Sequence, residues 1–169
     1  MNPFRWSFRT QFLLGFVACV AVVAYAIWTQ LYGGLEPCNL CIFQRVSFAL
    51  LALVFMMGAV HAPEKSGARG CYGVAAFLAA GVGLGIAARH VWVQSLSADL
   101  VPSCGPPLGF LKESVGVLGM IKKVLTASGS CGTIDWTFLG LSMPAWSLVC
   151  FIVLALWALY AGFSARKVS

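Results

Sequence analysis

Four apolar segments dominate the sequence and limit what it can fold into. They cover residues 12–30, 42–61, 71–89 and 144–163, and each is close to the ~20 residues that a helix needs to cross a bilayer. Of the 169 residues, 60% are hydrophobic and only 9% are charged, which is too little polar surface for a water-soluble globule. We therefore expect an all-α membrane protein, with a four-helix transmembrane bundle as its single domain over residues 1–169.

Basic residues between these segments predict how the chain is oriented. They precede the first segment, separate the second from the third and follow the fourth, at Arg5, Arg9, Lys65, Arg69, Arg166 and Lys167. Cytoplasmic loops of membrane proteins carry an excess of Lys and Arg, so both termini should be cytoplasmic and residues 31–41 and 90–143 should lie outside. The first apolar run exceeds the ~7–15 residues of a signal-peptide core, and we expect it to remain as a span.

The formal charge of +6 does not indicate a nucleic-acid partner. Proteins that bind nucleic acid gather basic residues into a patch or stripe, often with exposed aromatic side chains. No such cluster is present in this sequence. The composition points to the lipid bilayer as the main partner.

The third segment contains the run Gly81-Val82-Gly83-Leu84-Gly85. Gly81 and Gly85 have the GxxxG spacing that lets two membrane helices approach closely. Glycine is common in membrane spans for other reasons, so the pattern supports a compact bundle without specifying its contacts.

The seven cysteines divide according to this topology. Three lie within or at the start of apolar segments and are predicted to be small, buried apolar side chains: Cys19, Cys71 and Cys150. The other four fall on the outer side, where disulfides persist: Cys38, Cys41, Cys104 and Cys131.

Cys38 and Cys41 form a Cys-x-x-Cys motif directly before the second apolar segment. If that segment is a helix, the unpaired N–H groups and partial positive charge of its first turn lie beside Cys41 and favour the thiolate. Arg45 follows one helical turn later on the same face and adds a full positive charge. The motif alone also fits a structural disulfide or half of a zinc site, but its position favours a reactive thiol pair.

The long outer segment places the other two thiols in a different setting. Proline at positions 102, 106 and 107 surrounds Cys104, where a helix is not expected to persist. Residues 111–125 carry apolar side chains at helical spacing and predict a short amphipathic helix on the membrane surface. Gly129 and Gly132 then flank Cys131 with permissive backbone.

The spacing of the thiols argues against metal and haem ligation. A four-cysteine zinc site usually draws on two closely spaced pairs, and Cys104 lies far from Cys131 in the sequence, so we predict no metal ligands. Ile42, not His, follows Cys41, which excludes a haem-attachment motif. Redox chemistry is favoured over the alternative, a non-enzymatic four-span scaffold whose outer disulfides only brace loops.

Taken together, the motifs resemble the DsbB family of bacterial disulfide-generating membrane proteins. The resemblance is carried by Pro37-Cys38-Asn39-Leu40-Cys41-Ile42 with Gln44-Arg45, by the isolated Cys104, and by Ser128-Gly129-Ser130-Cys131 running into Trp136-Thr137-Phe138-Leu139-Gly140-Leu141-Ser142-Met143-Pro144. It covers about residues 10–163, including all four apolar segments and both cysteine pairs.

The resemblance implies a multi-pass protein of the bacterial inner membrane whose catalytic residues are Cys38, Cys41, Cys104 and Cys131. Cys104, paired with Cys131, would form the mixed disulfide with a reduced periplasmic DsbA-like thiol oxidase. The electrons would pass to the Cys38 and Cys41 pair and from Cys41 to ubiquinone or menaquinone. Arg45 would steady the thiolate and the quinone oxygen, and His90 matches a family position near the quinone.

Overall fold

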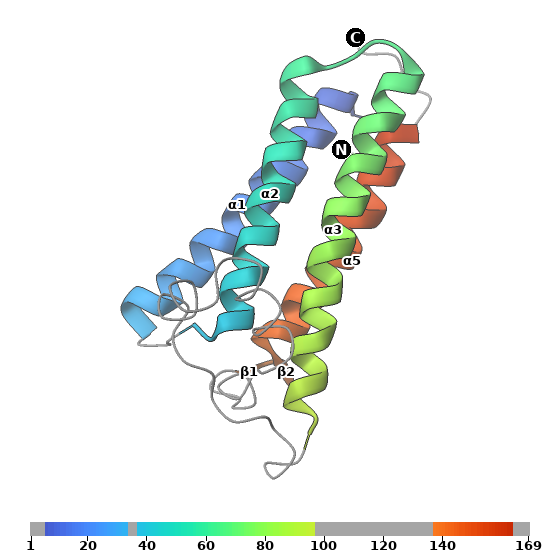
Figure 1. Cartoon of the computed structure of the whole chain (residues 1–169). Coiled ribbons are helices and arrows are strands. Elements are labelled where there is room, and N and C mark those ends of the chain that lie inside the picture. The colour runs from blue at the N-terminus through green and yellow to red at the C-terminus, as the bar shows by residue number, and fades with distance from the viewer. Residues whose placement is uncertain (1–5, 34–36, 97–136, 164–169) are drawn as a thin grey trace, which may run out of the picture.

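A computed structural model describes residues 6–33, 37–96 and 137–163 as four long helices and a short β-hairpin (Figure 1). The helices are α1 (Phe8–Gly33), α2 (Asn39–His61), α3 (Ser66–Gln94) and α5 (Met143–Phe163), and the hairpin strands are β1 (Thr137–Phe138) and β2 (Leu141–Ser142). All four helices are long and apolar enough to cross a membrane. The predicted all-α bundle is confirmed, while the surface helix predicted at residues 111–125 lies outside the described residues.

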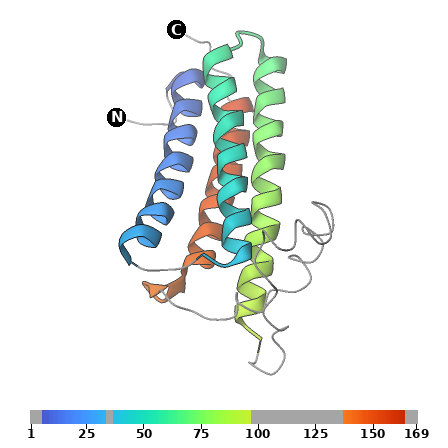
Figure 2. The same cartoon turned by 60° about the vertical axis from the view of Figure 1, so that its left-hand side comes forward.

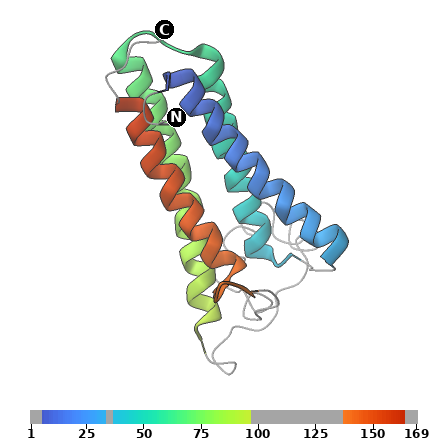
Figure 3. The same ribbon diagram turned by 180° about the vertical axis from the view of Figure 1, so that it is seen from behind.

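The helices form two pairs, with α1 beside α2 and α3 beside α5 (Figures 1 and 3). Figure 2 shows α2 in front of α5, with α1 and α3 on either side. The start of α1 and the end of α5 lie at the end of the bundle where α2 connects to α3 (Figure 1). The start of α2, the end of α3 and the hairpin lie at the opposite end, toward which α1 leans away from α5 (Figures 1 and 2).

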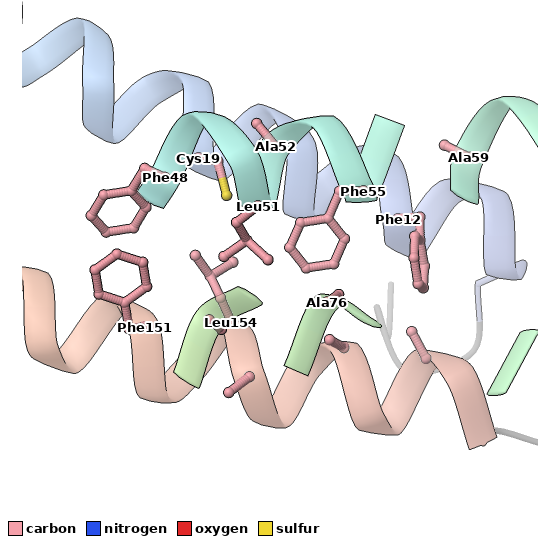
Figure 4. Packing of buried hydrophobic residues seen from close by; sticks show 14 of the residues in the cluster. Phe12, Cys19, Phe48, Leu51, Ala52, Phe55, Ala59, Ala76, Phe151 and Leu154 are labelled. Carbon is pink, nitrogen blue, oxygen red and sulfur yellow. The ribbon is translucent and has the colours of Figure 1, made fainter. Parts of the chain in front are cut away.

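Aromatic side chains on α2 pack against both α1 and α5 in the core (Figure 4). Phe48 stacks on Phe151 of α5, with ring centroids 3.9 Å apart and planes at 12°. Phe55 meets Phe12 of α1 edge-on at 5.2 Å. Such pairs add stabilisation beyond their buried area, and they hold α2 between α1 and α5.

Small residues bring α3 and α5 together, but the close backbone contacts do not involve Gly81 or Gly85. A Cβ on Gly73 would lie 2.9 Å from a backbone carbonyl oxygen of α5, and one on Gly162 would lie 2.9 Å from the Cα of Gly73. A Cβ on Gly81 or Gly85 would meet nothing within 4 Å in the described part of the chain. These two glycines therefore make no close helix contact there, although a Cβ on Gly83 between them would meet the Phe151 ring of α5.

The cysteines predicted to be buried differ in their environments. Cys19 is fully buried in the core, and Cys150 of α5 is partly buried. Cys71 is exposed on the outer surface of the bundle, so its predicted burial is wrong. Its neighbours Gly70 and Gly73 occupy the face of α3 that packs on α5, which leaves Cys71 on the outward side.

Candidate functional site

Helix α2 begins at the Cys-x-x-Cys motif itself, before the predicted start at residue 42. Cys38 is the N-cap residue, and its Sγ accepts a hydrogen bond from the backbone N–H of Cys41 at 3.4 Å. This contact satisfies one of the donors left unpaired at a helix start. Cys41 consequently lies in the first helical turn, where the partial positive charge of the helix end favours an anionic sulfur.

The two sulfur atoms face each other at this helix start. The Cys38 thiol donates to the Cys41 sulfur across 3.1 Å, a separation longer than the ~2.05 Å of a disulfide bond. Both side chains are partly buried. The arrangement is that of a dithiol whose sulfurs need little movement to form a bond.

His90, near the end of α3, is brought to these thiols from the neighbouring helix. Its Nε2 lies 3.6 Å from the Cys38 sulfur, and only 2% of the residue is exposed. An interfacial histidine facing water was an equally good interpretation of the sequence alone. The structure instead buries His90 against the Cys38 sulfur, where its Nε2 can share a proton with that sulfur.

Gln44 is a site residue to which the sequence assigned no role. Its Nε2 lies 3.1 Å from Nδ1 of His90, and the two side chains are 4% and 2% exposed. A buried amide at this point fixes which ring nitrogen of His90 carries its proton. The available signal was a polar side chain three residues after Cys41, on the same helical face and inside an apolar run.

Arg45 lies one turn beyond Cys41, as its spacing predicted, and binds the end of α1. Its guanidinium donates to the side-chain oxygen of Gln30 at 2.6 Å and to the carbonyl of Ala26 at 2.9 Å. Within the described ranges the only carboxylate belongs to Glu64, in the connection at the opposite end of the bundle. The charge of Arg45 is therefore not cancelled by a described acidic side chain.

A cavity of about 450 Å³ opens beside Cys41, between α1, α2 and α5. Its walls are mainly apolar and include Phe48 and Trp146. Cys41, Gln44 and Arg45 of α2 contribute polar groups to it, and Tyr25 of α1 and Ser147 of α5 add a hydroxyl each. A mainly apolar chamber with a few polar groups is the usual form of a small-molecule site.

The β-hairpin contributes Phe138 to this cavity. Both residues of its turn, Leu139 and Gly140, have positive φ, at 51° and 78°, as a type I′ turn requires. Trp146 of α5 donates its indole N–H to the carbonyl of Phe138 at 3.0 Å. Ser142 donates to the side-chain oxygen of Gln94 at 2.7 Å, so the hairpin is fastened to both α5 and the end of α3.

The structure thus brings together four of the predicted site residues: Cys38, Cys41, Arg45 and His90. Cys104 and Cys131 lie outside the described residues. Beyond Gln44, the contributions of Gln30, Phe138 and Trp146 were missed, because they come from other elements whose packing cannot be inferred from the spacing around the motif.

Four membrane-length helices around a dithiol at a helix start define a multi-pass membrane protein of thiol-disulfide chemistry. The family model described as "Disulfide bond formation protein DsbB" matches residues 8–161. Two relatives named "Disulfide bond formation protein B" come from Xanthomonas euvesicatoria pv. vesicatoria (strain 85-10) and Xylella fastidiosa (strain 9a5c). The first is 63% identical over 169 residues, or 100% of this chain and 98% of its own. The second is 49% identical over 167 residues, which cover 99% of this chain and 96% of the relative. The chain belongs to the DsbB family of disulfide bond formation proteins.

Proposed function

We propose that this protein reoxidises a periplasmic DsbA-type thiol oxidase and passes the electrons through its two cysteine pairs to a membrane quinone. The observation that carries the proposal is the position of Cys41, whose side chain lines an apolar cavity within the bundle. A dithiol that only braced a loop would have no need of such a chamber. A thiol oxidase of this type is a strong oxidant, so reoxidising it requires a stronger acceptor.

The residues around the cavity fit a quinone, either ubiquinone or menaquinone. Its volume of about 450 Å³ lies within the ~300–1,000 Å³ of typical ligand sites. Phe48, Phe138 and Trp146 contribute aromatic side chains to its wall, which suit contact with a planar ring. Arg45 offers N–H groups to a carbonyl oxygen and lies on the same wall as Cys41, so it would hold the ring near the sulfur.

The motif supplies the electrons. Oxidation of the Cys38 and Cys41 dithiol breaks two S–H bonds, forms one S–S bond and releases two electrons and two protons. A quinone, when bound, accepts both electrons and both protons. Arg45 and the helix start favour the anionic sulfur of Cys41, and His90 is placed to hold a proton at its Nε2 beside the Cys38 sulfur, 3.6 Å away.

The second pair, Cys104 and Cys131, would receive the electrons from the partner oxidase, with Cys104 forming the mixed disulfide. This assignment rests on family membership, and it predicts that Cys104→Ser abolishes covalent capture of a DsbA-type partner. Cys131→Ser should instead accumulate the mixed disulfide, because the resolving thiol is gone. A complex still trapped through Cys131 in Cys104→Ser would reverse the assignment.

We further propose that the protein lies in the bacterial inner membrane with both termini cytoplasmic and the cysteine pairs facing the periplasm. The start of α1 and the end of α5 lie at the end of the bundle away from the Cys38 motif (Figure 1). The basic residues near those ends support a cytoplasmic position for them.

Thiol counting distinguishes this function from a structural scaffold. The purified protein is reduced, freed of reductant and mixed with a soluble quinone, and both free thiols and remaining quinone are followed. The proposal requires four thiols to disappear in step with loss of quinone, whereas a scaffold would leave its thiols indifferent to quinone. Extraction of the purified protein with organic solvent would then identify the native quinone.

A further inference from the structure

We propose that Cys38, Cys41 and His90, in the reduced protein, form a three-ligand site for a thiophilic divalent cation such as Zn²⁺ or Cd²⁺. The two sulfurs and one imidazole nitrogen all lie within 4.8 Å of one another. Around a tetrahedral zinc ion, with Zn–S near 2.3 Å and Zn–N near 2.05 Å, neighbouring ligand atoms are roughly 3.6–3.8 Å apart. The Cys38 sulfur and His90 Nε2 already have this spacing, at 3.6 Å.

The sulfur pair needs only a small adjustment to fit. Its present separation is 3.1 Å, and ligation would widen it by roughly 0.7 Å, which side-chain rotation at a partly buried N-cap can supply. Two cysteines and one histidine are a known protein ligand set for zinc sites that keep a fourth position open. The sequence argument against zinc rested on the spacing of four cysteines. It does not apply to a site whose third ligand is a histidine of α3.

Gln44 supplies the outer contact that a metal-bound histidine usually has. A ligating imidazole presents a lone pair to the metal, while its other ring N–H is held by an oxygen acceptor. Gln44 lies 3.1 Å from Nδ1 of His90, and a half-turn of its amide places Oε1 there in place of Nε2. His90 Nδ1 would then donate to that oxygen, and its Nε2 would be left as the ligand.

Metal binding at this site needs no oxidant, because neither sulfur changes its oxidation state. Each thiol proton still present leaves as its sulfur–metal bond forms, and the two thiolates cancel the charge of the divalent cation, so the ligated group is neutral beside Arg45. The metal binds the two thiolate sulfurs, which a disulfide no longer offers. It would therefore bind only the reduced motif, and its binding would compete with oxidation of the two thiols. Neither the site nor its detection requires a quinone or a partner oxidase, so it is independent of the proposed function.

Cadmium titration tests the site directly. The protein carrying Cys104→Ser and Cys131→Ser is reduced, stripped with a chelator and titrated with Cd²⁺ while thiolate-to-cadmium absorption in the ultraviolet is recorded. We expect one Cd²⁺ per chain, displaced by Zn²⁺, and no such binding after the motif is oxidised. Gln44→Ala should weaken binding by the ~10–100-fold typical of outer contacts, and His90→Gln should weaken it by at least as much.

His61 provides the matched control, since it is the other of the two histidines. It lies at the end of α2 and pairs with Tyr72 at 2.9 Å, so His61→Gln should leave the Cd²⁺ affinity unchanged. Equal affinities in His90→Gln and the parent protein would overturn the proposal.

Alkylation tests the site without altering His90, which matters if that variant fails to fold. In the same double-serine protein, Cd²⁺ should protect Cys38 and Cys41 from iodoacetamide while the exposed Cys71 is still modified. Undiminished labelling of the motif cysteines at saturating Cd²⁺ would also overturn the proposal.

Discussion

Arg45 is bound to Gln30 at 2.6 Å, and this hydrogen bond joins α2 to the last turns of α1 beside the cavity. Together with the bond to the Ala26 carbonyl at 2.9 Å, it fixes a long side chain that would otherwise sample many rotamers. A preorganised guanidinium can act on a ligand or on a developing anion without first being ordered. The contact with α1 is therefore as relevant to the site as the spacing between Arg45 and Cys41.

Arg45→Ala should weaken the use of quinone. A hydrogen bond from a charged group is worth about 1.5–3 kcal/mol, so we expect the apparent Michaelis constant for a soluble quinone to rise by about tenfold or more. Quinone-dependent thiol oxidation in detergent provides the measurement. Gln30→Ala is the control, with a smaller increase, because the bond to Ala26 remains. An unchanged constant in Arg45→Ala would remove this residue from the quinone site.

Cys41→Ser should abolish quinone-dependent oxidation of the motif, because the remaining thiol of Cys38 cannot form the intramolecular disulfide. The measurement is quinone consumption by the reduced variant under single-turnover conditions. Cys71→Ser is the matched control, since that thiol is exposed on the outer surface of the bundle, and it should react like the parent protein. Quinone loss at the parental rate in Cys41→Ser would show that the electrons leave by another route.

Gln44→Ala should destabilise the protein and slow oxidation of the motif. The change leaves Nδ1 of His90 buried without the partner that now lies 3.1 Å away, and an unsatisfied buried polar group costs about 1–3 kcal/mol. We expect a lower thermal midpoint in detergent, together with slower thiol oxidation at saturating quinone. Gln44→Glu loses the Nε2 donor, but its carboxylate can accept a hydrogen bond from His90 when Nδ1 carries the proton, so it should recover part of both losses. Parental stability and rate in Gln44→Ala would mean that the contact with His90 has no such role.

The sequence predicted the helices well because membrane spans are set by length and hydropathy, which are local properties. It also placed Cys41 and Arg45 on one face of a helix start, since both lie within a single segment. The pairing of His90 with Cys38 depends on where α3 ends relative to α2, which no local pattern encodes. The GxxxG spacing could not specify a contact for the same reason. Glycine spacing does not say which face of a helix meets a neighbour, and the closest backbone approach to α5 is made at Gly73 and not at Gly81 or Gly85.

Gly73→Ala should destabilise the bundle, whereas Gly81→Ala should not. A Cβ on Gly73 would lie 2.9 Å from the backbone carbonyl oxygen of Ala158 and 3.0 Å from the Cα of Gly162, and backbone atoms cannot move aside as a flexible side chain can. Overpacking of this kind costs about 1–3 kcal/mol and should lower the thermal midpoint in detergent. A Cβ on Gly81, in the same helix, meets nothing within 4 Å in the described part of the chain. Comparing the two variants therefore separates the loss of close packing from any general effect of replacing glycine in α3. Equal midpoints would mean that α3 and α5 do not depend on this contact.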